Sequence, residues 1–180
     1  PPSKSYDHIS RSLDVGADGI IAPMVNSKEE VENILSCMQY PPQGKRGVAL
    51  GIAHDRYNPG NIEEVLQLTN QRMALAVLIE TIEGVENVEE IASVNGVDCL
   101  WIGHFDLSCS LGINGQFDHP NFVKAVNKVR RAAAKNNKSL GQLVNDDSTG
   151  YSNVYEVEMS KKEIHQKLNE WIGFTYNSAN

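Results

Sequence analysis

The chain has 180 residues, of which 41% are hydrophobic and 22% charged, and this length and composition are those of one ordinary globular domain. Its formal net charge of −7 disfavours nucleic acid or an anionic membrane as the main partner. No apolar run is long enough to span a membrane, and no signal-peptide pattern opens the sequence.

The three cysteines, Cys37, Cys99 and Cys109, are not spaced like the paired ligands of a metal site. Cys37 falls within a helical pattern and Cys99 begins an apolar run, so we interpret them as reduced thiols in or near a core. Reduced thiols are typical of a reducing compartment, and the sequence therefore predicts a cytoplasmic protein.

Predicted helices and strands alternate along the chain. Ser27 and Glu30 form a capping box at the start of one helix, and Pro120 is well placed in the first turn of another. In chain order the expected elements are a helix at Tyr6–Val15, a strand at Gly19–Val25, a helix at Ser27–Tyr40, a strand at Gly47–Leu50, a helix at Ile62–Gln71 with Ile62, Val65, Leu66 and Leu68 or Thr69 on one side, a strand at Ala74–Ile79, a helix at Val85–Val94, a strand at Cys99–Ile102, a helix at Pro120–Asn136 and a strand at Leu140–Val144.

The predicted strands are apolar throughout, which is typical of parallel strands buried on both faces. Alternating strands and helices form either a doubly wound sheet or a (β/α) barrel. No G-x-G-x-x-G motif follows a strand, which weakens a dinucleotide-binding interpretation. We favour the barrel because polar clusters follow the strands, where a barrel has its active face. These clusters are His54-Asp55-Arg56, Glu80-Thr81, Gly103–Ser108 and Asn145-Asp146-Asp147.

Glu80 and Asp106 are the candidate metal ligands. Each acid comes just past an apolar strand, and neighbouring parallel strands lie only about 4.8 Å apart, so both carboxylates can reach one cation. Taken alone, either acid is equally well explained as a first-turn residue of a helix or the start of a turn. Together with waters the two carboxylates form an oxygen-rich site that suits Mg²⁺ or Mn²⁺ better than Zn²⁺ and leaves positions open for substrate oxygens.

His54 and Arg46 are weaker candidates for substrate contacts. His54 follows the strand predicted at Gly47–Leu50 and would meet substrate on the active face. A surface-loop histidine beside a helix-capping residue is the alternative that we favour for it. Arg46 has two open interpretations, a contact with a distal substrate carboxylate or a hydrogen bond within its own loop.

Five motifs follow one another in the order and spacing of a known enzyme family. They are D-V-G-A-D-G-I-I-A-P-M-V at Asp14–Val25, Y-P-P-Q-G-K-R-G-V at Tyr40–Val48, I-E-T-I-E-G-V-E-N at Ile79–Asn87, W-I-G-H-F-D-L-S at Trp101–Ser108 and G-Q-F-D-H-P at Gly115–Pro120. On these motifs the run from Leu13 to Gly150 resembles the HpcH/HpaI aldolase/citrate lyase family of metal-dependent barrel enzymes. Several ordered motifs over roughly three quarters of the chain are far more specific than any single match.

The resemblance implies a TIM-type (β/α)8 barrel and a lyase that cleaves or forms a carbon–carbon bond between pyruvate, or a similar 2-oxo acid, and an aldehyde. It implies that Glu80 and Asp106 bind a divalent metal, Mg²⁺ or Mn²⁺ with Co²⁺ as a further candidate, which would stabilise an enolate. It also implies that Gly103, His104, Phe105 and Asp106 form a turn that holds the substrate carboxylate through free N–H groups. Such enzymes are typically homo-oligomers, in the catabolism of aromatic compounds or sugar acids.

The chain also departs from the family pattern. The catalytic His and substrate-binding Arg of the family would lie before Pro1. Residues 1–180 are therefore expected to be one partial barrel domain, which lacks the first two or three β-α units of a barrel of about 250 residues. Leu78 stands where many members have Gln, and His104-Phe105 replaces the commoner Pro-Ala. Residues 151–180 are expected to form a divergent tail without the closing helix of the family, with Gly173–Tyr176 as a weak strand candidate.

Two functions remain open from the sequence. The first is a pyruvate-type class II aldolase, since the Y-P-P-x-G-x-R-G run disfavours a citrate-lyase-like variant that acts on an acyl-CoA thioester. The second is a non-catalytic barrel fragment that keeps the metal site but lacks the catalytic base. A half-open barrel also leaves two strand edges that a partner or a second copy must cover.

Overall fold

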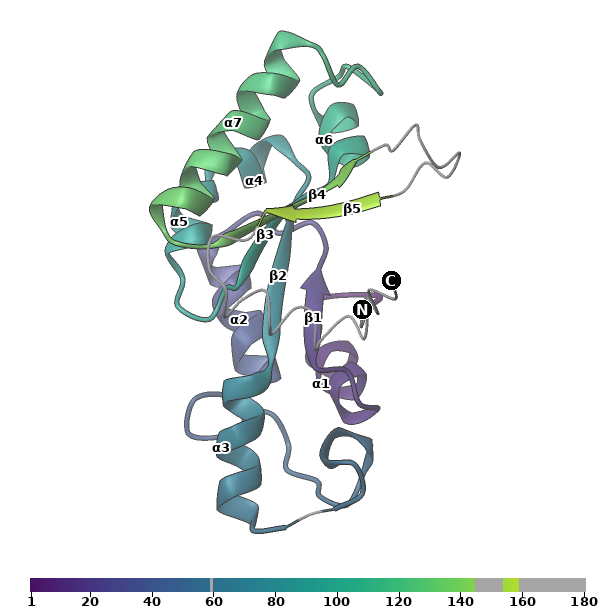
Figure 1. The fold of residues 1–180 in the computed structure, drawn as a ribbon, viewed down its shortest axis with the longest axis vertical. Helices are drawn as coiled ribbons and strands as arrows, with labels where there is room; N and C mark the ends of the chain where they lie inside the picture. The colour runs from purple at the N-terminus through teal and green to yellow at the C-terminus, as the bar shows by residue number, and fades with distance from the viewer. Residues whose placement is uncertain (59, 145–153, 159–180) are drawn as a thin grey trace, which may run out of the picture.

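A computed structural model describes residues 1–58, 60–144 and 154–158 of the chain. Its centre is a five-stranded sheet in the order β1-β2-β3-β4-β5, in which the first four strands are parallel and β5 runs antiparallel to β4 (Figure 1). The strands are β1 (Gly19–Ala22), β2 (Ala74–Ile79), β3 (Cys99–Ile102), β4 (Ser139–Val144) and β5 (Val154–Glu158). The helices are α1 (Tyr6–Asp14), α2 (Lys28–Met38), the 3-10 helix η1 (Ala53–Asp55), α3 (Ile62–Arg72), α4 (Ile82–Glu86), α5 (Val88–Ser93), α6 (His104–Ser110) and α7 (Pro120–Lys135).

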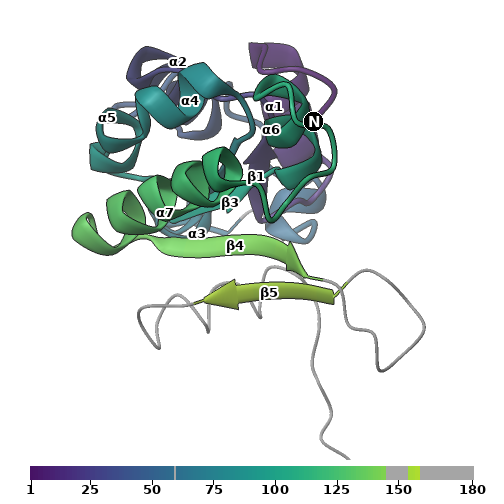
Figure 2. The ribbon, with the colours of Figure 1, turned by 90° about the horizontal axis from the view of Figure 1, so that it is seen from above.

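One face of the sheet forms the core together with the helices. Alternate strand residues, among them Ile20, Val77 and Leu100, are buried against the apolar sides of the helices. Figure 2 shows α2, α4, α5 and α7 gathered on one side of the strands. On the other face Ile21 is exposed and Trp101 is only half-buried. Ala76 and Cys99 of this same face are nevertheless buried, so the prediction that the strands are buried on both faces is met at these two positions of β2 and β3 and fails at Ile21 and Trp101.

The strand predicted at Gly47–Leu50 is wrong. These residues lie in the loop between α2 and η1, and β1 pairs directly with β2. The backbone donors of this loop are used elsewhere, because Arg46 N–H donates to the Gln39 carbonyl and Gly47 N–H donates to the Tyr6 hydroxyl. A segment whose donors are already satisfied has little to gain from pairing with a sheet.

The predicted cap of α2 is confirmed at Ser27, whose hydroxyl accepts the Glu30 N–H at 3.2 Å. The reciprocal half of the capping box differs, because the Glu30 carboxylate accepts the Asn26 N–H at 2.9 Å. Glu30 therefore holds the turn that enters α2.

The helix predicted at Val85–Val94 is instead two short helices, α4 and α5, with Asn87 at the break. The first of them begins earlier than predicted, because Thr81 serves as its N-cap and accepts the Gly84 N–H at 2.9 Å. Glu80 is therefore not the capping residue of this helix, which leaves its carboxylate available for another role.

α3 forms close to its predicted bounds and extends beyond the amino-terminal ends of the strands (Figure 1). Thr69 is its buried residue, whereas Ile62 and Leu68 are 53% and 64% exposed. The apolar side of α3 therefore contributes little to the core of the described chain.

β5 lies inside the stretch that was expected to be a divergent tail, and it was not predicted. Its sequence, V-Y-E-V-E, alternates apolar and polar residues, which is a usual strand pattern. The candidate strand at Gly173–Tyr176 and the polar cluster Asn145-Asp146-Asp147 lie outside the described residues.

The predicted reduced thiols are confirmed, since Cys37 and Cys99 are buried free cysteines and Cys109 is an exposed one. Among the helices of the described ranges, none has the length and apolar character needed to cross a bilayer.

Candidate metal-binding site

Glu80 and Asp106 lie at the carboxyl ends of two neighbouring parallel strands. The last residues of β2 and β3, Ile79 and Ile102, pair in register, and the Gly103 N–H donates to the Ile79 carbonyl at 3.2 Å. Glu80 follows β2 directly, and Asp106 lies in the first turn of α6. The two acids therefore lie at the same edge of the sheet, and the charge of Asp106 contributes to the raised pKa of Glu80.

The Glu80 side chain is 5% exposed and held by the backbone that follows β1. Its Oε1 accepts a hydrogen bond of 2.6 Å from the Met24 N–H. The pKa of Glu80 is raised, because burial outweighs the Met24 hydrogen bond, and the charge of Asp106 adds to the increase while Lys4 opposes it. A buried carboxylate beside a second acid gains stability as an anion when a cation is bound between them.

Gly103 is required by the space that Glu80 occupies. A Cβ on residue 103 would overlap a carboxylate oxygen of Glu80 and lie 2.7 Å from the Glu80 Cβ. The φ angle of Gly103 is −83°, which any residue adopts, so packing and not backbone conformation explains the glycine. The absence of a side chain lets the Glu80 carboxylate lie against the start of α6.

The Asp106 carboxylate is exposed and makes no hydrogen bond or ion pair with another residue of the described ranges. Across the same ranges, no cluster of three or more His, Cys, Asp or Glu is placed to hold a metal. The protein therefore supplies two carboxylates, one fixed by a backbone N–H and one open to a ligand. This donor set fits a hard cation that takes its other ligands from water and substrate oxygens.

Four aromatic rings, two of them from the first turn of α6, pack together: His104, Phe105, Phe117 and Phe122. The His104 ring centroid lies 4.3 Å from that of Phe105 and 5.0 Å from that of Phe117, and Phe117 lies 5.4 Å from Phe122. Burial lowers the pKa of His104, which favours the neutral imidazole. Phe105 is 59% exposed, so an apolar ring surface borders the metal site.

Arg46 lies at the opposite, amino-terminal end of the strands. Its guanidinium is 1% exposed, pairs with Asp14 at 2.9 Å and donates to the Met73 sulfur at 3.4 Å. Asp14 and Met73 come just before β1 and β2, and the guanidinium also lies 4.6 Å from the centroid of the Tyr40 ring. Arg46 therefore serves as a structural residue at this end of the sheet.

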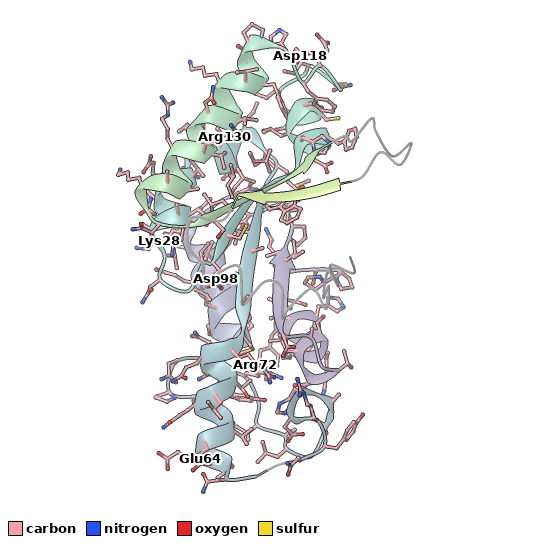
Figure 3. The ribbon with its side chains drawn as sticks, viewed as in Figure 1. Lys28, Glu64, Arg72, Asp98, Asp118 and Arg130 are labelled. Carbon is pink, nitrogen blue, oxygen red and sulfur yellow. The ribbon has the colours of Figure 1, made fainter. Side chains whose placement is uncertain are left out.

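His54 lies at the same end as Arg46. Its Nε2 is 2.6 Å from the Ala49 carbonyl, and its own carbonyl accepts a hydrogen bond of 3.1 Å from Arg72. Figure 3 marks the two ends of the molecule, with Arg72 below the sheet and Asp118 at the far end above it. The expectation that His54 lies on the same face as Glu80 is not met, because residues 47–50 form no strand that would carry the loop there.

Two residues of the site were missed from the sequence, and neither has a sequence signal. Met24 adopts a left-handed φ of 51°, and a methionine in the sequence does not indicate such a conformation. Lys4 lies far back in the chain, yet its Nζ donates to the Met24 carbonyl at 2.6 Å. A third contact had a signal: Thr81 caps α4, and its hydroxyl also donates to the Asn26 side chain at 2.5 Å.

The parallel β-α arrangement with two acids at adjacent strand ends defines an α/β protein of the TIM-barrel type. The model of the HpcH/HpaI aldolase/citrate lyase family matches residues 2–157, and the chain belongs to this family. The predictions of the fold class and of the family are thereby confirmed.

Relatives of known name fit this assignment. A 5-keto-4-deoxy-D-glucarate aldolase from Shigella boydii is 36% identical over 135 residues, which are 75% of this chain and 52% of the relative. The crystal structure of an HpcH/HpaI aldolase from Desulfitobacterium hafniense is similar with a TM-score of 0.76 and 34% identity, over 83% of this chain and 57% of that one. A family protein from Burkholderia cenocepacia gives a TM-score of 0.76 at 30% identity, over 83% of this chain and 59% of that one. The chain thus spans about half the length of the curated relatives that it matches.

Proposed function

We propose that the chain acts as a divalent-metal-dependent aldolase that cleaves a 2-oxo-4-hydroxy acid into pyruvate and an aldehyde. The observation that carries this proposal is the pair of carboxylates, Glu80 and Asp106, at the ends of adjacent parallel strands. The aldolase names of the relatives support the reaction class. The family supports a metal, and the two carboxylates favour Mg²⁺ or Mn²⁺, with Co²⁺ as the alternative.

In this proposal Glu80 and Asp106 hold the metal. When bound, the metal supplies a Lewis acid that stabilises the negative charge developing on the keto oxygen of the 2-oxo acid. Met24 orients Glu80 through its N–H, and Gly103 leaves the room that the Glu80 carboxylate needs. The protein thereby fixes one ligand before metal and substrate arrive, which reduces the cost of ordering them.

The substrate side of the site is formed by the turn from Gly103 to Asp106. We propose that the backbone of this turn receives the carboxylate of the 2-oxo acid, as the family resemblance implies. His104 is half-buried and favours its neutral form, so it adds no fixed positive charge there. The exposed ring of Phe105 offers an apolar surface beside the position that the aldehyde part would occupy.

The proposed substrate is a sugar-derived acid, by analogy with the Shigella boydii relative. Small-molecule partners, a cytoplasmic location and a homo-oligomeric state also remain proposals for this chain.

A second candidate is a protein that binds the metal without catalysing the reaction. In its favour, no further His, Cys, Asp or Glu in the described ranges joins Glu80 and Asp106 in a cluster.

Metal-dependent exchange of the pyruvate methyl protons separates the two candidates. The chain is incubated with pyruvate in D₂O with Mg²⁺ or Mn²⁺, and the methyl signal is followed by NMR. An aldolase must remove a methyl proton, so exchange is expected with metal and not with a chelator. Glu80→Gln and Asp106→Asn should abolish exchange, and Glu64→Gln, at the far end of α3 in Figure 3, should not. Metal binding without exchange would instead establish the non-catalytic candidate.

A further inference from the structure

The turn that follows β1 adopts a backbone conformation that needs external support. Met24 has a φ of 51°, in the left-handed region, which is unfavourable for a residue other than glycine. Such a residue persists where surrounding contacts hold both of its peptide groups. Met24 is about half exposed, at 46%, so the packing of its own side chain contributes little of that support.

Both backbone groups of Met24 are bound, and they are bound to different partners. The N–H donates to Glu80 Oε1 at 2.6 Å, and the carbonyl accepts from Lys4 Nζ, also at 2.6 Å. The same Nζ donates to Glu30 Oε2 at 2.9 Å, and that oxygen accepts the Asn26 N–H. Lys4 thus ties the turn after β1 to the first turn of α2.

The amino-terminal segment is placed for this contact. In Figure 1 the N-terminus lies beside the carboxyl end of β1, where the turn begins. The side chains of Lys4 and Glu30 are only 27% and 37% exposed, so this ion pair is partly shielded from water. Contacts to both a backbone carbonyl and a carboxylate restrict Lys4 more than an ordinary surface pair does.

We infer that Lys4 is a positioning residue for the metal site: by holding the Met24 carbonyl, it fixes the peptide whose N–H orients the Glu80 carboxylate. The part of this inference that concerns metal rests on the proposed function. Lys4 does not contact the candidate metal ligands itself, and its charge is paired with that of Glu30. Besides the direct effect of its charge on Glu80, its action on the site passes through the geometry of the turn.

This inference reverses the effect expected from charge alone. A lysine near a cation site repels the cation, so its removal would strengthen metal binding if charge were all that mattered. If Lys4 positions Glu80, its removal weakens metal binding instead. Partners that orient a ligand from outside the metal site typically change metal affinity by about 10- to 100-fold.

The test compares Lys4→Met, Lys4→Arg and Lys135→Met in the 180-residue chain. Lys135 is a matched control, because its Nζ pairs with Glu89 at the same 2.9 Å on a remote surface. Hydrogen exchange of the Met24 amide is measured by NMR without metal, and Mn²⁺ affinity is measured by electron paramagnetic resonance of the free ion. Thermal unfolding of each variant shows whether the chain stays folded.

Lys4→Met should speed exchange at Met24 by about tenfold or more and raise the Mn²⁺ dissociation constant by about tenfold. Lys4→Arg should restore much of both, and Lys135→Met should change neither. Unchanged exchange in Lys4→Met, or tighter Mn²⁺ binding, overturns the inference. If the unmodified chain binds no Mn²⁺, the proposed function fails, and the exchange at Met24 alone then decides whether Lys4 holds the turn.

Discussion

The carboxylate of Glu80 lies directly against the backbone of Gly103, where any side chain at residue 103 would collide with it. The contact joins the end of β2 to the start of α6, and so it couples the fixed metal ligand to the helix that carries Asp106. The site therefore depends on close packing as much as on the presence of two acids.

Gly103→Ala should disrupt the site with only a moderate loss of stability. The added Cβ would lie 2.7 Å from the Glu80 Cβ, so either Glu80 or the start of α6 must shift. Overpacking of this kind costs about 1–3 kcal/mol in the free energy of unfolding. We expect Mn²⁺ affinity to fall at least tenfold, measured by titration calorimetry, and urea unfolding to show a folded protein. Gly112→Ala is the control for lost stability alone, because a Cβ there meets no neighbouring atom but strains a backbone with a φ of 71°. Normal affinity in Gly103→Ala would contradict the packing argument.

Glu80→Gln should stabilise the metal-free chain at neutral pH. The pKa of Glu80 is raised in the folded chain, first by burial and also by the charge of Asp106. A carboxyl of this kind contributes stability that is fully present below its unfolded pKa and is lost as the pH rises through its folded pKa. The neutral amide escapes that loss and still accepts the Met24 N–H.

Thermal unfolding with a chelator, from about pH 4 to about pH 8, measures this effect. The melting temperature of Glu80→Gln should exceed that of the wild type near pH 8, and the two should converge near pH 4. Added Mn²⁺ should then raise the wild-type value alone, because a ligand stabilises the state that binds it. A variant less stable than the wild type at neutral pH without metal would show that Glu80 is not strained as an anion.

Arg46→Met should destabilise the chain and leave metal binding unchanged. Its loss leaves Asp14, whose side chain is 19% exposed, with only the longer contact to the exposed Arg11 at 3.7 Å in place of the partner at 2.9 Å. Removing one member of a largely buried ion pair costs about 3–5 kcal/mol. Urea unfolding should show this loss, and Mn²⁺ titration should give the wild-type affinity at low temperature. A stable variant with weakened pyruvate binding would restore Arg46 as a substrate residue.

The positions of Glu80 and Asp106 could be predicted from the sequence, whereas that of His54 could not, and the reason is physical. Glu80 and Asp106 were predictable because apolar runs mark buried strands, and parallel strands bring their carboxyl ends to one edge. His54 was misplaced because the four residues at 47–50 are too few for the pattern to separate a strand from an extended loop. Whether such a segment pairs depends on where its N–H groups find partners, and here one of them is the hydroxyl of Tyr6, distant in sequence.

The contacts that orient Glu80 were not predictable at all. The left-handed backbone of Met24 and the reach of Lys4 to its carbonyl depend on how segments far apart in the sequence meet. No local pattern encodes such contacts, since they are set by the assembled fold. A pattern of acids at strand ends can therefore identify a candidate metal ligand, but it does not identify the groups that fix the orientation of that ligand.

Thr81→Ala should loosen the turn after β1, which contains Met24 and Asn26, from the side of β2 and α4. The Thr81 hydroxyl caps α4 by accepting the Gly84 N–H at 2.9 Å, and it donates to the Asn26 side chain. Loss of the cap alone costs about 1 kcal/mol. Loss of the contact with Asn26 should also speed amide exchange at Met24, because Asn26 and Met24 belong to the turn that holds Glu80. Thr81→Ser keeps the hydroxyl and should retain most of the stability and of the exchange protection. Equal stability of the alanine and serine variants would show that the hydroxyl does not hold the turn, and that Glu80 depends on Met24 and Gly103 alone.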